Sequence, residues 1–76
     1  MKILTPSEMI DEWPSRRALA LDIGAKVEAV HKWAQAGRIP TDWQALVIKA
    51  ARLRGYDLTP EMMIEAHSRA SARAAQ

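Results

Sequence analysis

Apolar residues recur along this chain at intervals of three and four, which is the period of an α-helix. The segment from 27 to 34 shows this most clearly, with Val27, Val30, Trp33 and Ala34 on one side. No segment combines the strict alternation of a β-strand with hairpin signals at its ends. The pattern therefore predicts an all-α fold.

Capping residues and helix breakers divide the chain into about five short helices. Thr5-Pro6-Ser7-Glu8 matches a capping box with proline at the first helical position, and Pro14 should end that helix. Ser15 can cap a second helix, and Gly24 can end it because glycine tolerates positive φ. A third helix is expected over about 26–35.

Two further helices follow Gly37, which should end the third. Thr41-Asp42-Trp43-Gln44 matches a second capping box and opens a fourth helix that closes at Gly55. Thr59-Pro60-Glu61 begins a fifth helix over about 60–72. The side chains that we expect to face the core are Leu19, Ile23, Val30, Trp33, Trp43, Leu46, Val47, Ala50 and Leu53.

Composition narrows the class of protein. The chain has 76 residues and no cysteine, which fits a single domain, residues 1–76, without disulfides or thiolate metal sites. No stretch approaches transmembrane length and the opening apolar run is too short for a signal peptide, so we expect a cytoplasmic protein with no membrane partner. His31 and His67 lie far apart in the sequence, we expect His67 at the surface, and no catalytic or phosphate-loop motif occurs. We therefore expect no enzyme activity, no catalytic residue, no metal, no cofactor and no small-molecule substrate.

Positive charge gathers in the middle of the sequence. Residues 15–54 contain eight Lys or Arg and three Asp or Glu, a balance of +5, whereas the whole chain has a net charge of +2. A surplus of this kind is typical of the part of a domain that faces a polyanion. The alternative is an ordinary solvated surface with an uneven distribution of charge.

Within this basic region, residues 16–33 read RRALALDIGAKVEAVHKW. A helix-turn-helix motif needs a small residue where its helices cross, a glycine at the turn four residues later, and a β-branched residue that packs back. Ala20, Gly24 and Val30 have these types at these spacings, which places the motif at about 15–34. We assign Trp33 and Trp43 to the core rather than to base stacking.

On these residues the chain resembles the Cro and repressor class of phage helix-turn-helix proteins. The continuation WAQAGRIPTDW resembles more narrowly a phage and prophage subgroup in which W-x-x-x-G-R-I-P follows the recognition helix. The resemblance covers about residues 13–55. It implies a lambda-repressor-like fold whose second motif helix enters the major groove of DNA. The chain departs from the subgroup at Lys26, where a Ser or Thr helix cap is usual.

The side of the third helix opposite the expected core should carry the base-reading residues, which are Lys26, Val27, Glu28, His31 and Lys32. Lysine and histidine can donate to purine acceptors or, for lysine, to phosphate, and Val27 can meet a thymine methyl. Glu28 can accept from cytosine or only repel wrong sequences. Arg16 and Arg17 stand at the start of the crossing helix and suit phosphate, and Arg38 suits either phosphate or the dipole of the third helix.

Apolar residues beyond the expected core predict a protein interface made by Ile48, Tyr56, Met62, Met63 and Ile64. Unused apolar surface on a small chain usually marks an interface, and methionine adapts to irregular gaps. We expect a two-fold dimer through the fourth and fifth helices that presents two reading helices about 34 Å apart. The alternative is that Met62 and Met63 cover the monomer core and the chain dimerises only on DNA.

The sequence therefore predicts a sequence-specific regulator of transcription that binds double-stranded DNA. We expect a phage or prophage-type repressor that binds a palindromic operator as a homodimer. The alternative is a helical protein-interaction module, an adaptor or an antagonist of another regulator, that does not read DNA. Only the first function requires strongly salt-dependent binding to random duplex DNA.

Overall fold

The chain folds into α-helices packed around one buried core. The computed structural model describes the backbone of residues 5–74 and the side chains of residues 5–68. The helices are α1 (Pro6–Ile10), α2 (Arg16–Ile23), α3 (Val27–Ala36), α4 (Thr41–Leu53) and α5 (Pro60–Ala74). No strand occurs among the described residues, and the predicted all-α class is confirmed.

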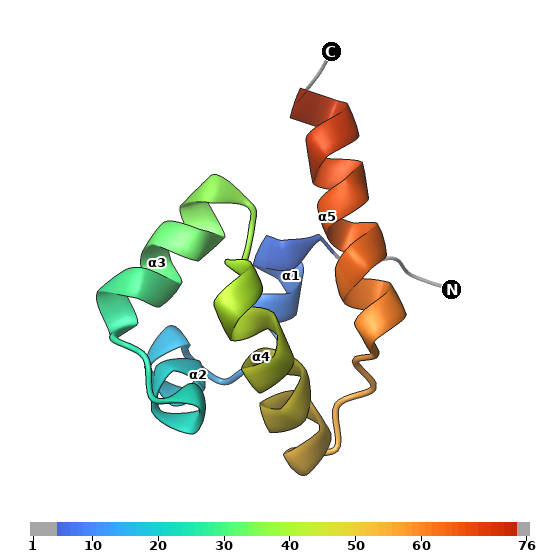
Figure 1. Ribbon diagram of the computed structural model, residues 1–76. Helices are drawn as coiled ribbons and strands as arrows, with labels where there is room; N and C mark the ends of the chain where they lie inside the picture. Colours follow the sequence, from blue (N-terminus) through green and yellow to red (C-terminus); the bar gives the residue numbers. More distant parts are fainter. Residues whose placement is uncertain (1–4, 75–76) are drawn as a thin grey trace.

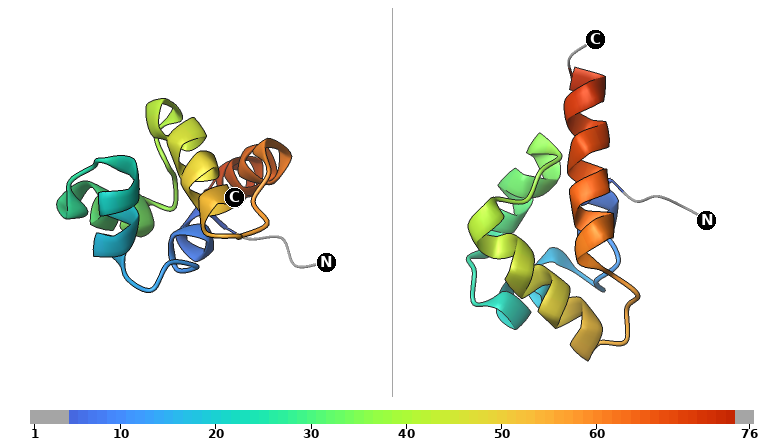
Figure 2. Two further views of the ribbon diagram at one scale, coloured as in Figure 1. Left: turned by 90° about the horizontal axis from the view of Figure 1, so that it is seen from below. Right: turned by 45° about the vertical axis from the view of Figure 1, so that its right-hand side comes forward.

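The pair α2 and α3 is separated from α5 in the fold. α2 and α3 lie together on one side, α5 lies on the other, and α4 crosses between them (Figure 1). Two further views also keep α3 and α5 apart (Figure 2). α1 packs against α3 and α5, and α4 packs against α2 and α5. The basic α2–α3 region therefore faces away from the C-terminal helix.

Side-chain caps fix the starts of α1, α2 and α5 where the sequence predicted them. Thr5 makes both hydrogen bonds of the capping box, at 3.2 and 2.9 Å. Ser15 and Thr59 each accept from the backbone N–H three residues later, at 3.1 and 3.2 Å. These bonds satisfy amides that have no partner within the helix. α1 is shorter than expected, because it ends at Ile10 rather than at Pro14.

The predicted capping box at Thr41 is wrong. Pro40, with φ −57° and ψ 145°, is the N-cap, and no side chain caps α4. Gln44 Nε2 donates instead to the carbonyl of Ile39, at 2.8 Å. The Ile39 side chain is only 1% exposed, and its burial holds the linker between α3 and α4 against the core. Thr41 is therefore the first residue of α4 and not its cap.

The core draws on every helix. Trp43, expected to be enclosed, is only partly buried and lies against Trp33 with the ring centroids 5.6 Å apart. The predicted core residues that the structure confirms as buried are Leu19, Ile23, Val30, Trp33, Val47 and Ala50. Others that contribute are Met9, Ile10, Trp13, Ala20, Ile39, Ala51, Leu58, Met63 and Ala66.

Two leucines of α4 do not face the core as predicted. Leu46 is 43% exposed and Leu53 is 81% exposed. The buried stripe of α4 consists of Val47, Ala50 and Ala51. The two alanines let neighbouring helices approach closely, and this narrow contact leaves both leucines beside the stripe rather than within it.

The predicted dimer surface is partly used inside the monomer. Met63 is 1% exposed, so its assignment to a dimer interface is wrong, and it is a core residue of α5. Tyr56 packs edge-to-face on Trp13, with the ring centroids 5.2 Å apart and the planes at 84°. Ile48 and Met62 are partly buried, whereas Ile64 is 65% exposed.

His67 connects α5 to the linker between α3 and α4. We expected it at the surface, but it is partly buried. Its Nε2 accepts from the backbone N–H of Ile39 at 2.8 Å, and its Nδ1 lies 2.8 Å from the carbonyl oxygen of Met63. Because a carbonyl only accepts, Nδ1 carries the proton and the imidazole is neutral in this arrangement.

Candidate nucleic-acid interface

α2 and α3 meet at a tight corner centred on Gly24. This glycine has φ 74° and ends α2 in the left-handed conformation. The backbone N–H of Ala25 donates to the carbonyl of Ala20 at 2.9 Å, which closes the turn. Ala20 is 3% exposed and Val30 is fully buried, as the motif spacing requires of residues that lie between two packed helices. A backbone hydrogen bond and buried side chains thus fix the position of α3 relative to α2.

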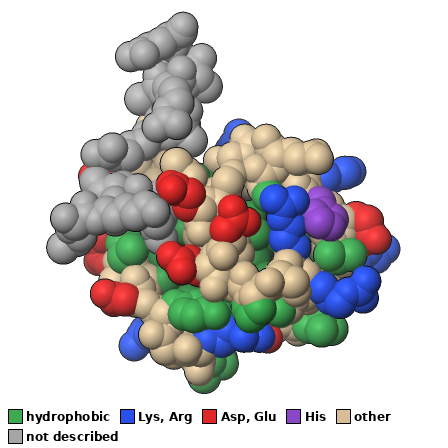
Figure 3. Space-filling view, turned by 180° about the vertical axis from the view of Figure 1, so that it is seen from behind, with side chains coloured by type: hydrophobic (Ala, Val, Ile, Leu, Met, Phe, Trp, Pro, Cys, Tyr) green, Lys and Arg blue, Asp and Glu red, His purple; other side chains and the backbone are tan. Residues whose placement is uncertain are grey.

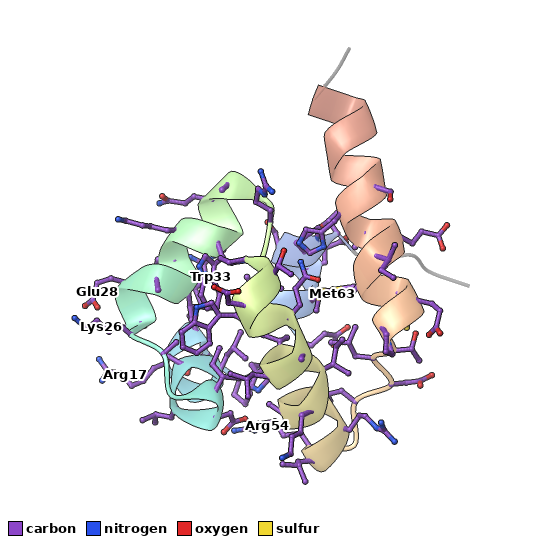
Figure 4. The ribbon with its side chains drawn as sticks, viewed as in Figure 1. Arg17, Lys26, Glu28, Trp33, Arg54 and Met63 are labelled. Carbon is purple, nitrogen blue, oxygen red and sulfur yellow. The ribbon has the colours of Figure 1, made fainter. Side chains whose placement is uncertain are left out.

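The outer side of α3 carries most of the predicted base-reading residues. Lys26, Glu28, His31 and Lys32 are exposed, whereas Val27 is partly buried against the core. Lys26 and Glu28 point away from the core on the same side as Arg17 (Figure 4). Seen from behind, Lys and Arg side chains are concentrated toward one edge of the molecule, and most acidic side chains lie on the other half (Figure 3).

One contact bridges α2 and α3 on this outer side. Arg16 Nη1 lies 3.0 Å from His31 Nδ1, and both side chains reach solvent. A guanidinium can only donate, so Nδ1 is the acceptor and the ring proton is on Nε2. In this contact His31 presents its Nε2–H as a hydrogen-bond donor. The two residues are 15 apart in the sequence, and no sequence signal indicated that they would meet.

The start of α3 is suited to an anion. Lys26 is the N-cap and makes no side-chain cap hydrogen bond. The positive end of a helix dipole and a lysine ammonium therefore lie at the same place. Arg38 is exposed beyond the other end of α3, and ten helical residues separate the two ends by about 15 Å.

A cluster behind the corner anchors α2 to the rest of the fold. The Asp22 carboxylate accepts from Trp13 Nε1 at 2.9 Å and forms an ion pair with Arg54. A second bond, from Arg54 Nη2 to Asp22 Oδ1, measures 3.3 Å. The Arg54 hydrogen bond, followed by the Trp13 bond, lowers the pKa of Asp22 below its ordinary value. No local pattern in the sequence predicts this cluster.

Other kinds of site have little support in residues 5–68. No group of three or more His, Cys, Asp or Glu side chains is placed there to hold a metal ion. No helix of the described part is long and apolar enough to cross a membrane. No family model, curated protein or solved structure matches this chain.

Proposed function

We propose that this chain is a sequence-specific DNA-binding regulator of transcription, with α2 and α3 as its helix-turn-helix and α3 as the recognition helix. In this proposal it is a cytoplasmic repressor of the phage or prophage type, and it binds a palindromic operator as a homodimer. A single module of this size makes few base contacts, and two copies related by a two-fold axis double them.

The observation that carries the proposal is the outer side of the α2–α3 corner. Lys26, Glu28, His31 and Lys32 are exposed there together, in front of a packed crossing between Ala20 and Val30. An α-helix with its side chains is about 10–12 Å in diameter, so α3 fits a major groove about 12 Å wide. Arg16 and Arg17 lie where a crossing helix meets the DNA backbone, which suits phosphate.

Exposed leucines favour the second candidate, a protein-interaction module that does not read DNA. Leu21 on α2 is 76% exposed, and Leu53 on α4 is 81% exposed. An adaptor or an antagonist of another regulator would bury such side chains against its partner. This candidate requires no affinity for random duplex DNA.

A salt titration separates the two candidates. We expect the purified chain to bind a random duplex, measured by fluorescence anisotropy, with an affinity that falls linearly on a log–log plot against salt. Arg17→Ala should weaken binding to every sequence alike and flatten the slope by about one unit. Binding that is absent, or that does not change with salt, would contradict the proposal.

Selection from a randomised duplex library then gives the operator. On that operator, His31→Ala and Lys32→Ala should each cost about 1–3 kcal/mol and relax the preference at one or two base pairs. Arg17→Ala serves as the comparison, because a phosphate contact carries no sequence information. Equal losses on all sequences for the three variants would show that α3 does not read bases.

A further inference from the structure

α4 presents a stripe that is both apolar and basic, and all its residues are exposed except Ile48, which is partly buried. Ala45, Ile48, Lys49, Arg52 and Leu53 follow the i, i+3, i+4, i+7, i+8 spacing of one helix face. Together with Pro60, at the start of α5, these residues line a shallow groove. None of the lining residues is acidic, and the side chain of Leu53 is 81% exposed.

α5 presents an exposed stripe of the opposite charge. Glu61, Ile64, Glu65 and Ser68 have the i, i+3, i+4, i+7 spacing, and all four are exposed. Ile64 lies between the two glutamates in this stripe and is 65% exposed. Met63 and Ala66, on the opposite side of α5, are buried in the core. The stripe is therefore the outer face of a docked helix.

The two stripes match in chemistry and adjoin in space. In each stripe an isoleucine precedes a charged residue, Lys49 after Ile48 in α4 and Glu65 after Ile64 in α5. Arg52 and Glu61 line one further hollow, at the loop between α4 and α5. A surface with adjacent basic and acidic halves is complementary to itself under a two-fold rotation, because the rotation brings each half onto the other.

We propose that a second copy of this chain occupies the α4 groove through the α5 stripe, while the first copy does the same in return. In this dimer Ile64 enters the groove beside Ile48 and Leu53 of the other copy. Glu61 and Glu65 face Lys49 and Arg52 across the two-fold axis. Both contacts occur twice, so the dimer has four pairs of opposite charge around two apolar contacts.

This arrangement rests on the proposed function only for its purpose, which is to hold two recognition helices together. α3 and α5 lie on different sides of the molecule (Figure 1), so contacts at the α5 stripe do not involve α3. Its charge pairing also predicts that dissociation increases with salt, because screened charges attract each other less.

Charge reversal tests the pairing on the full chain by sedimentation velocity. Wild type should form a species of twice 8.5 kDa at micromolar concentration. The double variants Lys49→Glu/Arg52→Glu and Glu61→Lys/Glu65→Lys should each raise the dissociation constant at least about tenfold, because like charges then face each other. All four positions are exposed, and circular dichroism will verify that each variant remains folded.

Restoration is the decisive control. An equimolar mixture of the two double variants should form a heterodimer, since each reversed stripe then meets its complement. The variant with all four reversals on one chain has the net charge of wild type and should dimerise as wild type does. A monomeric wild type, double variants that dimerise unchanged, or a mixture that remains monomeric would each overturn the interface.

Salt-dependent DNA binding is measured separately, so a monomer that binds DNA refutes this dimer alone, and a dimer that does not bind DNA refutes the proposed function alone.

Discussion

At the scale of single residues, Asp22 shows how a surface acid becomes a structural one. Its carboxylate joins the indole of Trp13, after α1, to the guanidinium of Arg54, after α4. A carboxylate that accepts from two donors is stabilised in its charged form, which is why its pKa is lowered. A group with a lowered pKa stabilises the fold when it is ionised, and it loses that contribution as the pH falls.

Asp22→Asn should therefore lower the free energy of unfolding at neutral pH. It should also make that free energy change less as the pH falls into the acid range. The wild-type contribution is fully present above the ordinary carboxyl pKa of 3.8 and disappears as the pH falls through the lowered value. Urea unfolding from pH 7 to pH 2.5 should show two midpoints that converge in acid. Glu12→Gln, which removes an exposed carboxyl outside this cluster, is the control. A constant gap between the midpoints of Asp22→Asn and wild type would contradict the ion pair.

At the scale of the helix, α3 combines weak capping with a position that suits an anion. Lys26 leaves the first amides of α3 without a side-chain acceptor and adds a positive charge at the positive end of the dipole. Both effects lower the stability of the isolated helix. The same two effects would favour a bound phosphate, as the proposed DNA binding requires.

Lys26→Ser should separate these two effects. The serine can accept from an amide in the first turn, so the free energy of unfolding should rise by about 0.5–1 kcal/mol, measured by thermal or urea denaturation. Binding to duplex DNA should weaken and its salt slope should flatten, because a cation is lost. If the variant is less stable than wild type, or binds DNA equally well, Lys26 does not have this double role.

At the scale of the whole molecule, α5 is attached to the linker that follows α3. His67 accepts from the Ile39 amide, Gln44 donates to the Ile39 carbonyl, and the Ile39 side chain is buried. Ser7, in α1, donates to the carbonyl of Ala34 at 2.6 Å and holds the end of α3 from another direction. The C-terminal helix thus helps to fix where α3 ends.

His67→Ala should leave the partly buried amide of Ile39 without an acceptor. We expect a loss of about 1–3 kcal/mol in the free energy of unfolding and faster hydrogen exchange at that amide. His31→Ala is the matched control, because His31 is exposed and its loss should change stability by about 0.5 kcal/mol or less. If hydrogen exchange at the Ile39 amide is unchanged in His67→Ala, the hydrogen bond to His67 does not protect that amide.

The sequence by itself determined the helical period, the caps of α1, α2 and α5, and the Ala20, Gly24 and Val30 crossing. These features depend on neighbours within a few residues, where spacing and local hydrogen bonds decide the outcome. The exposed side of α3 follows from the same period, which is why four of the five residues predicted there are exposed.

Only the tertiary structure decided how apolar residues divide between core and surface. Met63 and Ile64 are neighbouring apolar residues, yet one is 1% exposed and the other 65% exposed, because the rotation of α5 depends on what it packs against. The predictions of a buried Leu53 and an exposed His67 are wrong for the same reason. Contacts such as Asp22 with Arg54, 32 residues apart, exist only once helices are placed in space, and no local pattern encodes that placement.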